Sequence, residues 1–536
     1  MLALICGLGT FASFDALGAA RGAEVVRNDF ERNYDGWYGN GGRVTLTAAD
    51  GAGIDGSRGM LVSGRAGARD GAASSKGLYL KGGVSYEYSV QVYCDAPEKF
   101  RFELLCGAGR FGAPPTAITI ASQDVEPGKW TTLSGNCAAP ERAADFILSI
   151  ATDSANDFRF DDLRVVGEAP AELQDAAAEK GLKDYFNGSF RVGNILNGRT
   201  INNRAIAATI LKDCNSVECE NETKPDSTLS RSLSHGTEVG VTLRAAAAIF
   251  DFCVRNNLPV RGHTLVWHSQ TPGWFFKENF DDRGEWVDPA TMDARMESYI
   301  KNMFGAIAEQ YPDLKLYAYD VCNEAISDDF RRVKEFDGAR EPGDNNAEHG
   351  KSAWVRVYGD NSFVEKAFVY ARKYAPEGCL LYYNDYNEYM EHKRDCIYKL
   401  CKSLYEKGLL DGVGMQTHVR ANVDGFGGVD AWRVAMEKYL SIGCSVMVTE
   451  MDVSLDKGKF SLEDQAAKYA AIFKAARDWN AAHEGNNRVL ALCVWGPNDA
   501  NSWLGEGSDG LLYDRQNAPK PAYDALTALA GAKDGN

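Results

Sequence analysis

The sequence lacks two features that would point to a nucleic-acid or membrane protein: a surplus of basic residues and, beyond its first twenty or so residues, a long apolar run. Lysine and arginine total 58 against 75 acidic residues, so the formal net charge is −17. Phosphate binding needs a concentrated basic surface, which argues against a nucleic-acid partner and suits an uncharged ligand. A membrane helix needs about 20 apolar residues in succession, so we expect no membrane span.

Zinc-type cysteine patterns are also missing, although the chain has 13 cysteines. No Cys-x-x-Cys pair and no Cys/His cluster with metal-ligand spacing occurs, so we expect neither a metal nor any other cofactor. Cys322 and Cys493 lie in apolar stretches that are typical of core strands. Most thiols should therefore be buried and free, with one or two disulfides left open.

The first residues, 1–22, combine a short apolar run with small residues, a pattern typical of a secretory signal peptide. No basic residues precede the run, and Asp15 interrupts it. We predict a processed leader and a secreted or cell-surface protein, with a disordered start of the chain as the alternative.

Two folded domains are expected, because a single core rarely grows to 536 residues. Residues 24–166 are rich in Gly, Ser and Thr and contain alternating segments such as 86–93, which predicts an all-β sandwich. Within residues 170–536, helical periodicity, as in 243–252 and 296–307, alternates with short apolar strands. This alternation predicts an α/β domain with a parallel sheet.

Eight strand candidates follow residue 185, each trailed by a helical or loop segment. They centre near Val192, Val217, Val260, Ala318, Leu381, Val413, Val446 and Leu492. Eight such units predict a (β/α)8 barrel, in which the chemistry lies at the carboxyl ends of the strands.

Acidic residues appear where two of these strands end. The fourth candidate runs into Asn323 and Glu324, and the seventh into Glu450 and Asp452. Strands four and seven lie across a barrel from each other, so the two glutamates can face one another over a bound substrate. Paired carboxylates are what glycoside hydrolysis requires, since one must donate a proton while the other stays ionised.

Four motifs together resemble those of family 10 glycoside hydrolases, which are chiefly endo-β-1,4-xylanases. They are residues 220–224, 261–268, 320–325 and 449–452, and they occur in order within 170–536. The resemblance implies endo-hydrolysis of xylan and xylo-oligosaccharides with retention at the anomeric carbon. It implies Glu324 as general acid/base and Glu450 as nucleophile, with carboxyl groups about 5 to 5.5 Å apart.

The same resemblance implies roles for the surrounding polar and aromatic residues. His418 and Asp452 would hold the nucleophile ionised and oriented, with Gln416 in the same network, and Asn323 would donate to the sugar 2-hydroxyl. Further substrate contacts are implied for Glu220, Asn221, Lys224, His263, Trp267, Gln270, Asn384, Tyr386, Trp495 and Trp503. Trp495 and Trp503 resemble the two indoles that cover the sugar at the cleavage point.

Two positions depart from the family pattern. Leu504 stands where a basic residue is frequent, ahead of a Gly-rich loop to Leu512, so binding on the leaving-group side can differ. Tyr319 stands where Trp is usual beside the acid/base motif, and this change should preserve activity.

The amino-terminal domain resembles carbohydrate-binding modules of family 22 through residues 28–42, 61–65 and 157–162, which implies xylan binding. Residues 66–70 lack the aromatic platform that the family carries shortly after its Gly-Arg pair. A sugar-binding module and a structural or spacing domain are therefore both open, and Trp37 and Tyr38 could be core residues.

Three other functions remain as alternatives. The enzyme could act on β-glucans, which assays on xylan and on glucans would separate. A non-catalytic polysaccharide-binding protein is disfavoured because both carboxylates are present. A metal-dependent hydrolase using His263 and His268 lacks supporting spacing, and insensitivity to a chelator would dispose of it. We expect a monomer.

Overall fold

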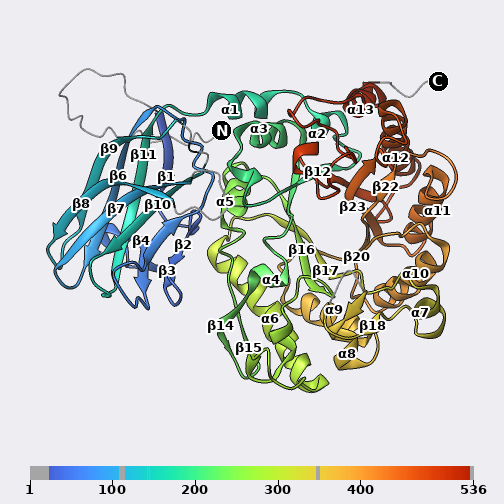
Figure 1. The fold of residues 1–536 in the computed structure, drawn as a ribbon, viewed down its shortest axis with the longest axis horizontal. Coiled ribbons are helices and arrows are strands. Elements are labelled where there is room, and N and C mark those ends of the chain that lie inside the picture. The colour runs from blue at the N-terminus through green and yellow to red at the C-terminus, as the bar shows by residue number, and fades with distance from the viewer. Residues whose placement is uncertain (1–22, 108–114, 142, 144, 346–349, 532–536) are drawn as a thin grey trace, which may run out of the picture.

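The computed structural model describes residues 23–107, 115–141, 143, 145–345 and 350–531 (Figure 1). The predicted leader, 1–22, lies outside the described residues. The chain forms an all-β sandwich followed by an eight-stranded parallel barrel with helices around it, so the predicted fold class is confirmed.

The sandwich consists of two antiparallel sheets. One has the order β3-β4-β11-β6-β9 with β1 beside β11, and the other has the order β2-β5-β10-β7-β8. Buried and exposed residues alternate along its long strands, so each sheet turns one apolar face inward. The strands are β1 (Ala23–Asn28), β2 (Trp37–Asn40), β3 (Thr45–Asp50), β4 (Arg58–Ser63), β5 (Gly71–Ser74), β6 (Ser85–Cys94), β7 (Glu98–Gly107), β8 (Thr116–Val125), β9 (Thr131–Ala138), β10 (Asp145–Thr152) and β11 (Phe158–Gly167).

The barrel closes through eight parallel strands in the order β21-β20-β17-β16-β13-β12-β24-β23, with β21 paired to β23. All eight strand candidates of the sequence fall within these strands. They are β12 (Arg191–Leu196), β13 (Ser216–Cys219), β16 (Val260–Trp267), β17 (Leu316–Asn323), β20 (Leu380–Asp385), β21 (Gly412–Met415), β23 (Ser445–Ser454) and β24 (Val489–Val494). The short β22 (His418–Arg420) continues beyond β21 and pairs with β23, which brings His418 opposite Asp452.

Helices cover the outside of the barrel, and several begin with side-chain caps. Asp288 accepts hydrogen bonds from the first turn of α6, and Ser461 and Asp464 form a reciprocal cap on α12. The helices are α1 (Ala171–Ala178), α2 (Leu182–Tyr185), α3 (Arg204–Asp213), α4 (Pro225–Thr228), α5 (Ala247–Arg255), α6 (Pro289–Gln310), α7 (Phe330–Glu335), α8 (Ala353–Tyr358), α9 (Ser362–Tyr374), α10 (Glu391–Glu406), α11 (Val429–Leu440), α12 (Leu462–Ala482) and α13 (Pro521–Gly531). Small ladders are β14 (Leu229–His235) with β15 (Glu238–Val241), and β18 (Glu341–Pro342) with β19 (Lys351–Ser352).

The turn at residues 33–36 of the sandwich docks on the barrel. The Tyr34 amide donates to the Gln310 carbonyl at 3.0 Å, and the Asn33 side chain donates to Asp313 at 3.0 Å. A Cβ at Gly36 would lie 3.2 Å from Cβ of Asp251, so the turn passes directly against α5. The sandwich therefore contacts α5 and is bonded to the end of α6 and the loop after it, through both backbone and side-chain hydrogen bonds.

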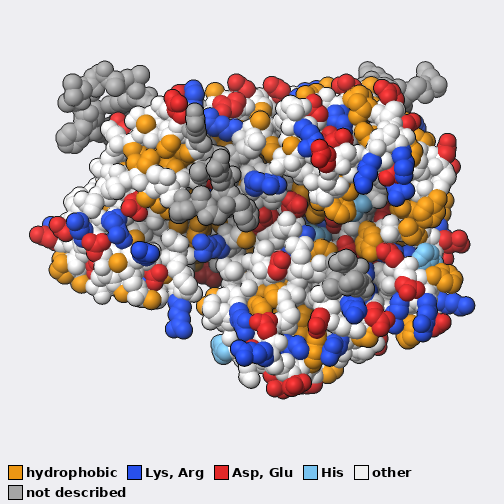
Figure 2. Space-filling model, viewed as in Figure 1, with side chains coloured by type: hydrophobic (Ala, Val, Ile, Leu, Met, Phe, Trp, Pro, Cys, Tyr) orange, Lys and Arg blue, Asp and Glu red, His pale blue; other side chains and the backbone are white. Residues whose placement is uncertain are grey.

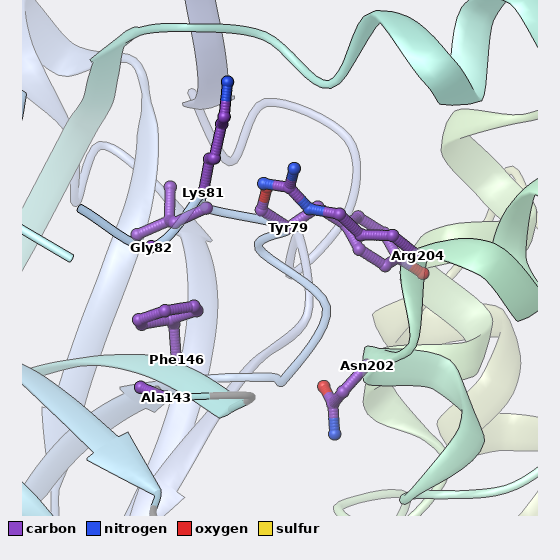
Figure 3. A pocket seen from close by; sticks show the side chains of 8 residues that line it. Tyr79, Lys81, Gly82, Ala143, Phe146, Asn202 and Arg204 are labelled. Atoms are coloured by element: carbon purple, nitrogen blue, oxygen red, sulfur yellow. The ribbon is translucent and has the colours of Figure 1, made fainter. Parts of the chain in front are cut away.

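The connection between the two units is also held in place. Only residues 168–170 separate β11 from α1. The Glu168 carbonyl accepts from the Tyr86 hydroxyl at 3.3 Å, and its carboxylate pairs with Lys81. Beside this connection lies a pocket of about 240 Å³, to which the sandwich contributes Tyr79, Lys81 and Phe146 and the barrel contributes Asn202 and Arg204 (Figure 3).

Trp37 and Tyr38 both pack against other residues of the protein. Trp37 is 1% exposed, packs on Phe30 and Phe160 in the sandwich core, and donates its N–H to Asn28. The guanidinium of Arg244, on the barrel side, lies 4.7 Å from the centre of the Tyr38 ring. Both aromatic residues are thus occupied by protein contacts.

All twelve cysteines in the described residues are free thiols, and all but Cys137 are buried. This confirms the expectation of buried thiols, and no disulfide forms within the described part of the chain. Acidic and basic side chains are interspersed over the face shown in Figure 2. Among the helices described here, none is both long and apolar enough to cross a membrane.

Candidate active site

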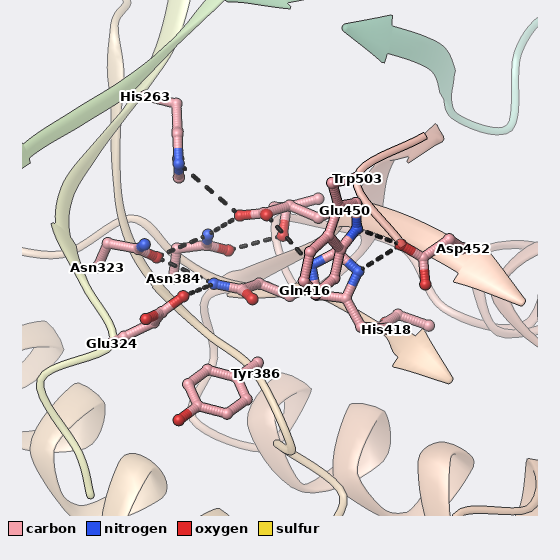
Figure 4. Close-up of polar contacts among 12 residues, drawn as sticks. His263, Asn323, Glu324, Asn384, Tyr386, Gln416, His418, Glu450, Asp452 and Trp503 are labelled. Atoms are coloured by element: carbon pink, nitrogen blue, oxygen red, sulfur yellow. Dashed lines mark hydrogen bonds and ion pairs between the residues drawn. The ribbon is translucent and has the colours of Figure 1, made fainter. Parts of the chain in front are cut away.

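The carboxyl ends of the barrel strands bring the predicted catalytic residues together (Figure 4). Glu450 lies in β23, Glu324 directly follows β17, and Asn384 lies in β20. Because the strands are parallel and closed into a ring, their carboxyl ends meet at one mouth, where side chains far apart in sequence touch.

Glu450 is buried beside two histidines and an amide. It is 5% exposed, accepts from Nδ2 of Asn384 at 2.7 Å and lies 3.3 Å from Nε2 of His418. Nε2 of His263 lies 3.9 Å away. Burial works against the charged form, but His263, His418 and Arg261 outweigh it and lower the pKa of Glu450 to about 2. The carboxyl is therefore ionised at neutral pH.

His418 is clamped between two carboxylates. Its Nδ1 lies 2.7 Å from Asp452 while Nε2 faces Glu450. Burial alone would lower its pKa, but the charge and hydrogen bond of Asp452, followed by those of Glu450, raise it to about 10. Asp452 also accepts from the indole N–H of Trp503 at 2.8 Å. The structure thus brings together the predicted His418–Asp452 pair and connects it to Trp503.

Glu324 has neutral partners instead. Its two oxygens accept from the Trp267 indole N–H and from Nε2 of Gln416, each at 2.8 Å. Its backbone is left-handed at φ 55°, and its carbonyl accepts from Nε of Arg340 at 2.6 Å. The buried Arg340 therefore supports an unusual conformation that aims Glu324 into the mouth.

Amide side chains connect the two carboxylates. Asn323 lies 3.0 Å from Asn384 and 3.2 Å from Gln416. Asn384 reaches on to Glu450 and Gln416 to Glu324, so one chain of amides spans the mouth. Asn384 is itself fixed by the hydroxyl of Thr449, at 2.6 Å.

A polar wall adjoins this centre. Nζ of Lys224 contacts Asn221 at 3.1 Å and Gln270 at 3.0 Å, and lies 4.8 Å from the centre of the Trp267 ring. Burial lowers the pKa of Lys224. Glu220 lies next along the wall and accepts from Asn197 at 2.6 Å. These fixed donors and acceptors suit a ligand with many hydroxyl groups.

Aromatic residues differ in how they meet the mouth. Trp495 is buried with its ring 5.5 Å from that of His263, whereas Trp503 is 56% exposed and lies across His418, 4.9 Å between ring centres. Tyr386 lies beside the amide chain in Figure 4, and Nζ of Lys393 is 3.6 Å from its ring centre. Tyr319 is fully buried against Phe304, 5.3 Å between ring centres, so its ring is a core residue behind the acid/base motif.

A buried ion cluster beneath the mouth was not predicted. Arg261 is fully buried, lies 3.2 Å from Glu218, pairs with Asp320 and donates to the Thr449 carbonyl at 2.9 Å. Asp320 also holds Nδ1 of His263 at 2.8 Å. The sequence pattern could have indicated it, because Arg261 and His263 are two residues apart in β16 and therefore point to the same side of the strand. No set of three potential ligands converges as a metal site in the residues described.

A closed parallel barrel with two carboxylates of unequal surroundings at its mouth is the architecture of a class of glycoside hydrolases. Comparison with known families agrees, since the sequence pattern described as "Glycosyl hydrolase family 10" matches residues 181–529. The chain belongs to this family. Residues 22–156 match a pattern described as "Carbohydrate binding domain".

Similar proteins include xylanases that share both units. Endo-1,4-beta-xylanase Y of Acetivibrio thermocellus is 52% identical over 508 residues, which cover 94% of this chain and 47% of that protein. Endo-1,4-beta-xylanase A of Thermotoga neapolitana is 31% identical over 524 residues, 94% of this chain and 46% of that protein. The chain thus spans about half the length of these curated relatives.

A solved structure covers nearly the whole chain. The carbohydrate-binding and catalytic modules of Clostridium thermocellum xylanase 10B, complexed with xylohexaose, are 52% identical with a TM-score of 0.89. The match covers 95% of this chain and 97% of that one. A psychrophilic family 10 endo-beta-1,4-xylanase matches at 29% identity and a TM-score of 0.54, over 65% of this chain and 99% of that one.

Proposed function

We propose that this chain hydrolyses internal β-1,4-xylosidic bonds in xylan and xylo-oligosaccharides with retention at the anomeric carbon. The observation that carries the proposal is the inequality of the two carboxylates. Glu450 is buried against cationic His418, whereas Glu324 receives only neutral hydrogen bonds. The similarity to endo-1,4-beta-xylanases supports the choice of substrate.

The first step forms a covalent intermediate. Ionised Glu450 attacks the anomeric carbon while Glu324 gives its proton to the departing glycosidic oxygen, so the C–O bond to the leaving sugar breaks as an ester to Glu450 forms. His418, held by Asp452, keeps Glu450 ionised and fixes its direction.

The second step releases the product. Glu324, now ionised, takes a proton from water, and the water oxygen attacks the anomeric carbon and displaces Glu450. Two inversions give net retention, and such a mechanism requires carboxyl groups about 5 to 5.5 Å apart. Asn323, Asn384 and Gln416 would hold sugar hydroxyls and both carboxylates in one frame.

The wall residues are proposed to bind the sugar on the non-leaving side. These are Glu220, Asn221, Lys224, His263, Trp267 and Gln270, with Trp495 and Trp503 covering the sugar ring at the cleavage point. Tyr386 is proposed to contact substrate from the strand that carries Asn384. Aromatic faces match the apolar faces of pyranose rings.

For the sandwich, the match to a carbohydrate-binding domain supports sugar binding, and two observations support a structural role beside it. Its turn at 33–36 is docked on the barrel, and residues 66–70 offer no aromatic side chain for stacking. We also propose that the chain divides into domains at residues 24–166 and 170–536. We further propose that residues 1–22 are the leader of a secreted or cell-surface protein and that the chain is a monomer. Culture fractionation and size-exclusion chromatography test the last two points.

The first experiment measures reducing sugar released from unbranched xylan and from β-glucan by the purified chain. Xylan hydrolysis that disappears in Glu450→Ala supports the proposal. Preference for β-glucan would keep the mechanism but change the substrate. No release from either polymer by folded protein would overturn the enzyme and favour a binding role.

A further inference from the structure

Glu388 lies just beyond the strand that carries Asn384, and nothing in the proposed chemistry uses it. It is 1% exposed, so its carboxyl group is buried. Its Oε1 accepts two hydrogen bonds from a single residue, from the backbone N–H of Thr417 at 3.1 Å and from the hydroxyl of Thr417 at 3.0 Å. Burial disfavours its charged form and raises the pKa of Glu388 to about 7.

Thr417 is the middle residue of a tripeptide that touches both proposed catalytic carboxylates. On one side Gln416 donates to Glu324 at 2.8 Å, and on the other His418 faces Glu450 at 3.3 Å. A shift of Thr417 would therefore move a partner of the acid/base and a partner of the nucleophile together.

The conformation of Thr417 needs external support. Its φ is +62°, in the left-handed region that β-branched residues rarely adopt. Besides Glu388, the indole N–H of Trp432 donates to the Thr417 hydroxyl at 3.0 Å. Glu388 is fixed in turn, because the hydroxyl of Tyr439 donates to its carbonyl at 3.0 Å. Helix α11, which carries both aromatic residues, thus braces the turn from behind.

We propose that Glu388 is a positioning residue for the hydrolytic reaction: by holding Thr417 in the left-handed conformation, it sets Gln416 against Glu324 and His418 against Glu450. This rests on the proposed function for its catalytic consequence. The anchoring of the tripeptide stands on geometry alone.

Only one oxygen of Glu388 performs this anchoring. Oε2 has no hydrogen-bond partner among the described residues. A glutamine keeps an acceptor oxygen for both Thr417 donors, whereas an alanine removes it. Glu388→Gln therefore separates the acceptor oxygen from the negative charge, and Glu388→Ala removes the acceptor together with the side chain.

The test combines crystal structures with pH profiles of kcat/KM on xylan. In Glu388→Ala we expect His418 and Gln416 to leave their carboxylate partners and kcat/KM to fall about 10- to 100-fold, as misplacement by about 1 Å can do. The acid limb of the profile should move to higher pH, because Glu450 loses the cation that keeps it ionised. Glu388→Gln should stay within about threefold of wild type. Glu391→Ala, an exposed glutamate at the start of α10, is the matched control.

Each outcome decides the point. A folded Glu388→Ala with His418 in place and an unchanged pH profile overturns the proposal. If Glu388→Ala does not fold, Thr417→Val removes the hydroxyl that bonds Glu388 and Trp432 but keeps the backbone N–H bond to Glu388. It should show the same shift more weakly, and a wild-type profile there overturns the proposal. If the wild-type chain releases no sugar, the proposed function fails, while displacement of His418 in the Glu388→Ala crystal still supports the anchor and an unmoved His418 rejects it.

Discussion

Glu450 and Glu324 are the same kind of side chain at the same mouth, yet Glu450 has a cationic hydrogen-bond partner and Glu324 has neutral ones. Glu450 faces His418, whose pKa is raised to about 10, and its own pKa falls to about 2. The hydrogen bonds to the Glu324 carboxyl come from the neutral N–H groups of Trp267 and Gln416, and the cations Lys224 and Arg340 act on it without bonding its oxygens. The difference teaches that neighbours, and not residue type, distinguish the two carboxyl groups, and it is the basis on which we propose their separate roles.

The largest expected loss of activity follows removal of Glu450, the carboxylate with the lowered pKa. Glu450→Ala should lower kcat on xylan by roughly 10⁴-fold or more, because no other group can form the glycosyl ester. Steady-state hydrolysis measures this, with a thermal melt as the control for folding. Residual activity within tenfold of wild type would assign the nucleophile elsewhere.

The second effect depends on the leaving group. Glu324→Ala should lower kcat on xylan by roughly 10²- to 10⁴-fold, the usual contribution of general acid–base catalysis. With an aryl xylobioside whose phenol needs no proton, formation of the intermediate should be much less impaired. Equal losses on both substrates would remove the contrast between the two carboxylates.

A third effect tests the charge beside Glu450. A depressed carboxyl pKa means that the active, ionised form persists far into acid. Asp452→Asn weakens the cationic His418, so the pKa of Glu450 should rise and the loss of activity on acidification should begin at higher pH. Each unit by which the pKa of Glu450 rises should move the midpoint of the acid limb up by one pH unit, so a one-unit rise from about 2 should roughly halve activity at pH 3 relative to that at pH 7 and change it little at pH 4. His235→Gln, on the exposed hairpin, is the control, and an unmoved acid limb argues against this electrostatic role.

The smallest effect concerns the outer edge of the mouth. Trp503→Ala removes an indole that is 56% exposed and one hydrogen bond to Asp452. We expect KM for xylo-oligosaccharides to rise several-fold, since a stacking contact is worth about 1 kcal/mol, with a minor change in kcat. A fall in kcat larger than the rise in KM would show that Trp503 acts mainly through Asp452.

The sequence predicted the barrel because each strand leaves an apolar run ending in polar residues, and all eight candidates lie in strands. Strand ends placed Glu324 and Glu450 at the mouth, whereas the other side chains there, such as His418 and Gln416, were implied by the family resemblance. Arg261 and Asp320 belong to two of the family-like motifs, 261–268 and 320–325. Their ion cluster inside the barrel was not predicted, because it depends on the pairing of neighbouring strands. Glu388 could not be assigned from one sequence, because its partner Thr417 is 29 residues away.

The contacts between sandwich and barrel could not be predicted from the sequence either. The turn at 33–36 reads as an ordinary polar loop, and its bonds to Gln310 and Asp313 join residues some 280 positions apart. Such pairs carry no local signature, since neither periodicity nor turn chemistry depends on them.

The hydrogen-bonded connection at 168–170 should affect the susceptibility of the chain to proteolysis. A protease needs several residues of extended, unpaired backbone, and here the link between the units is short, bonded to Tyr86 and tied to Lys81. Limited digestion of the folded protein should leave the two units joined in one resistant fragment. A long flexible linker between domains would instead be cleaved first.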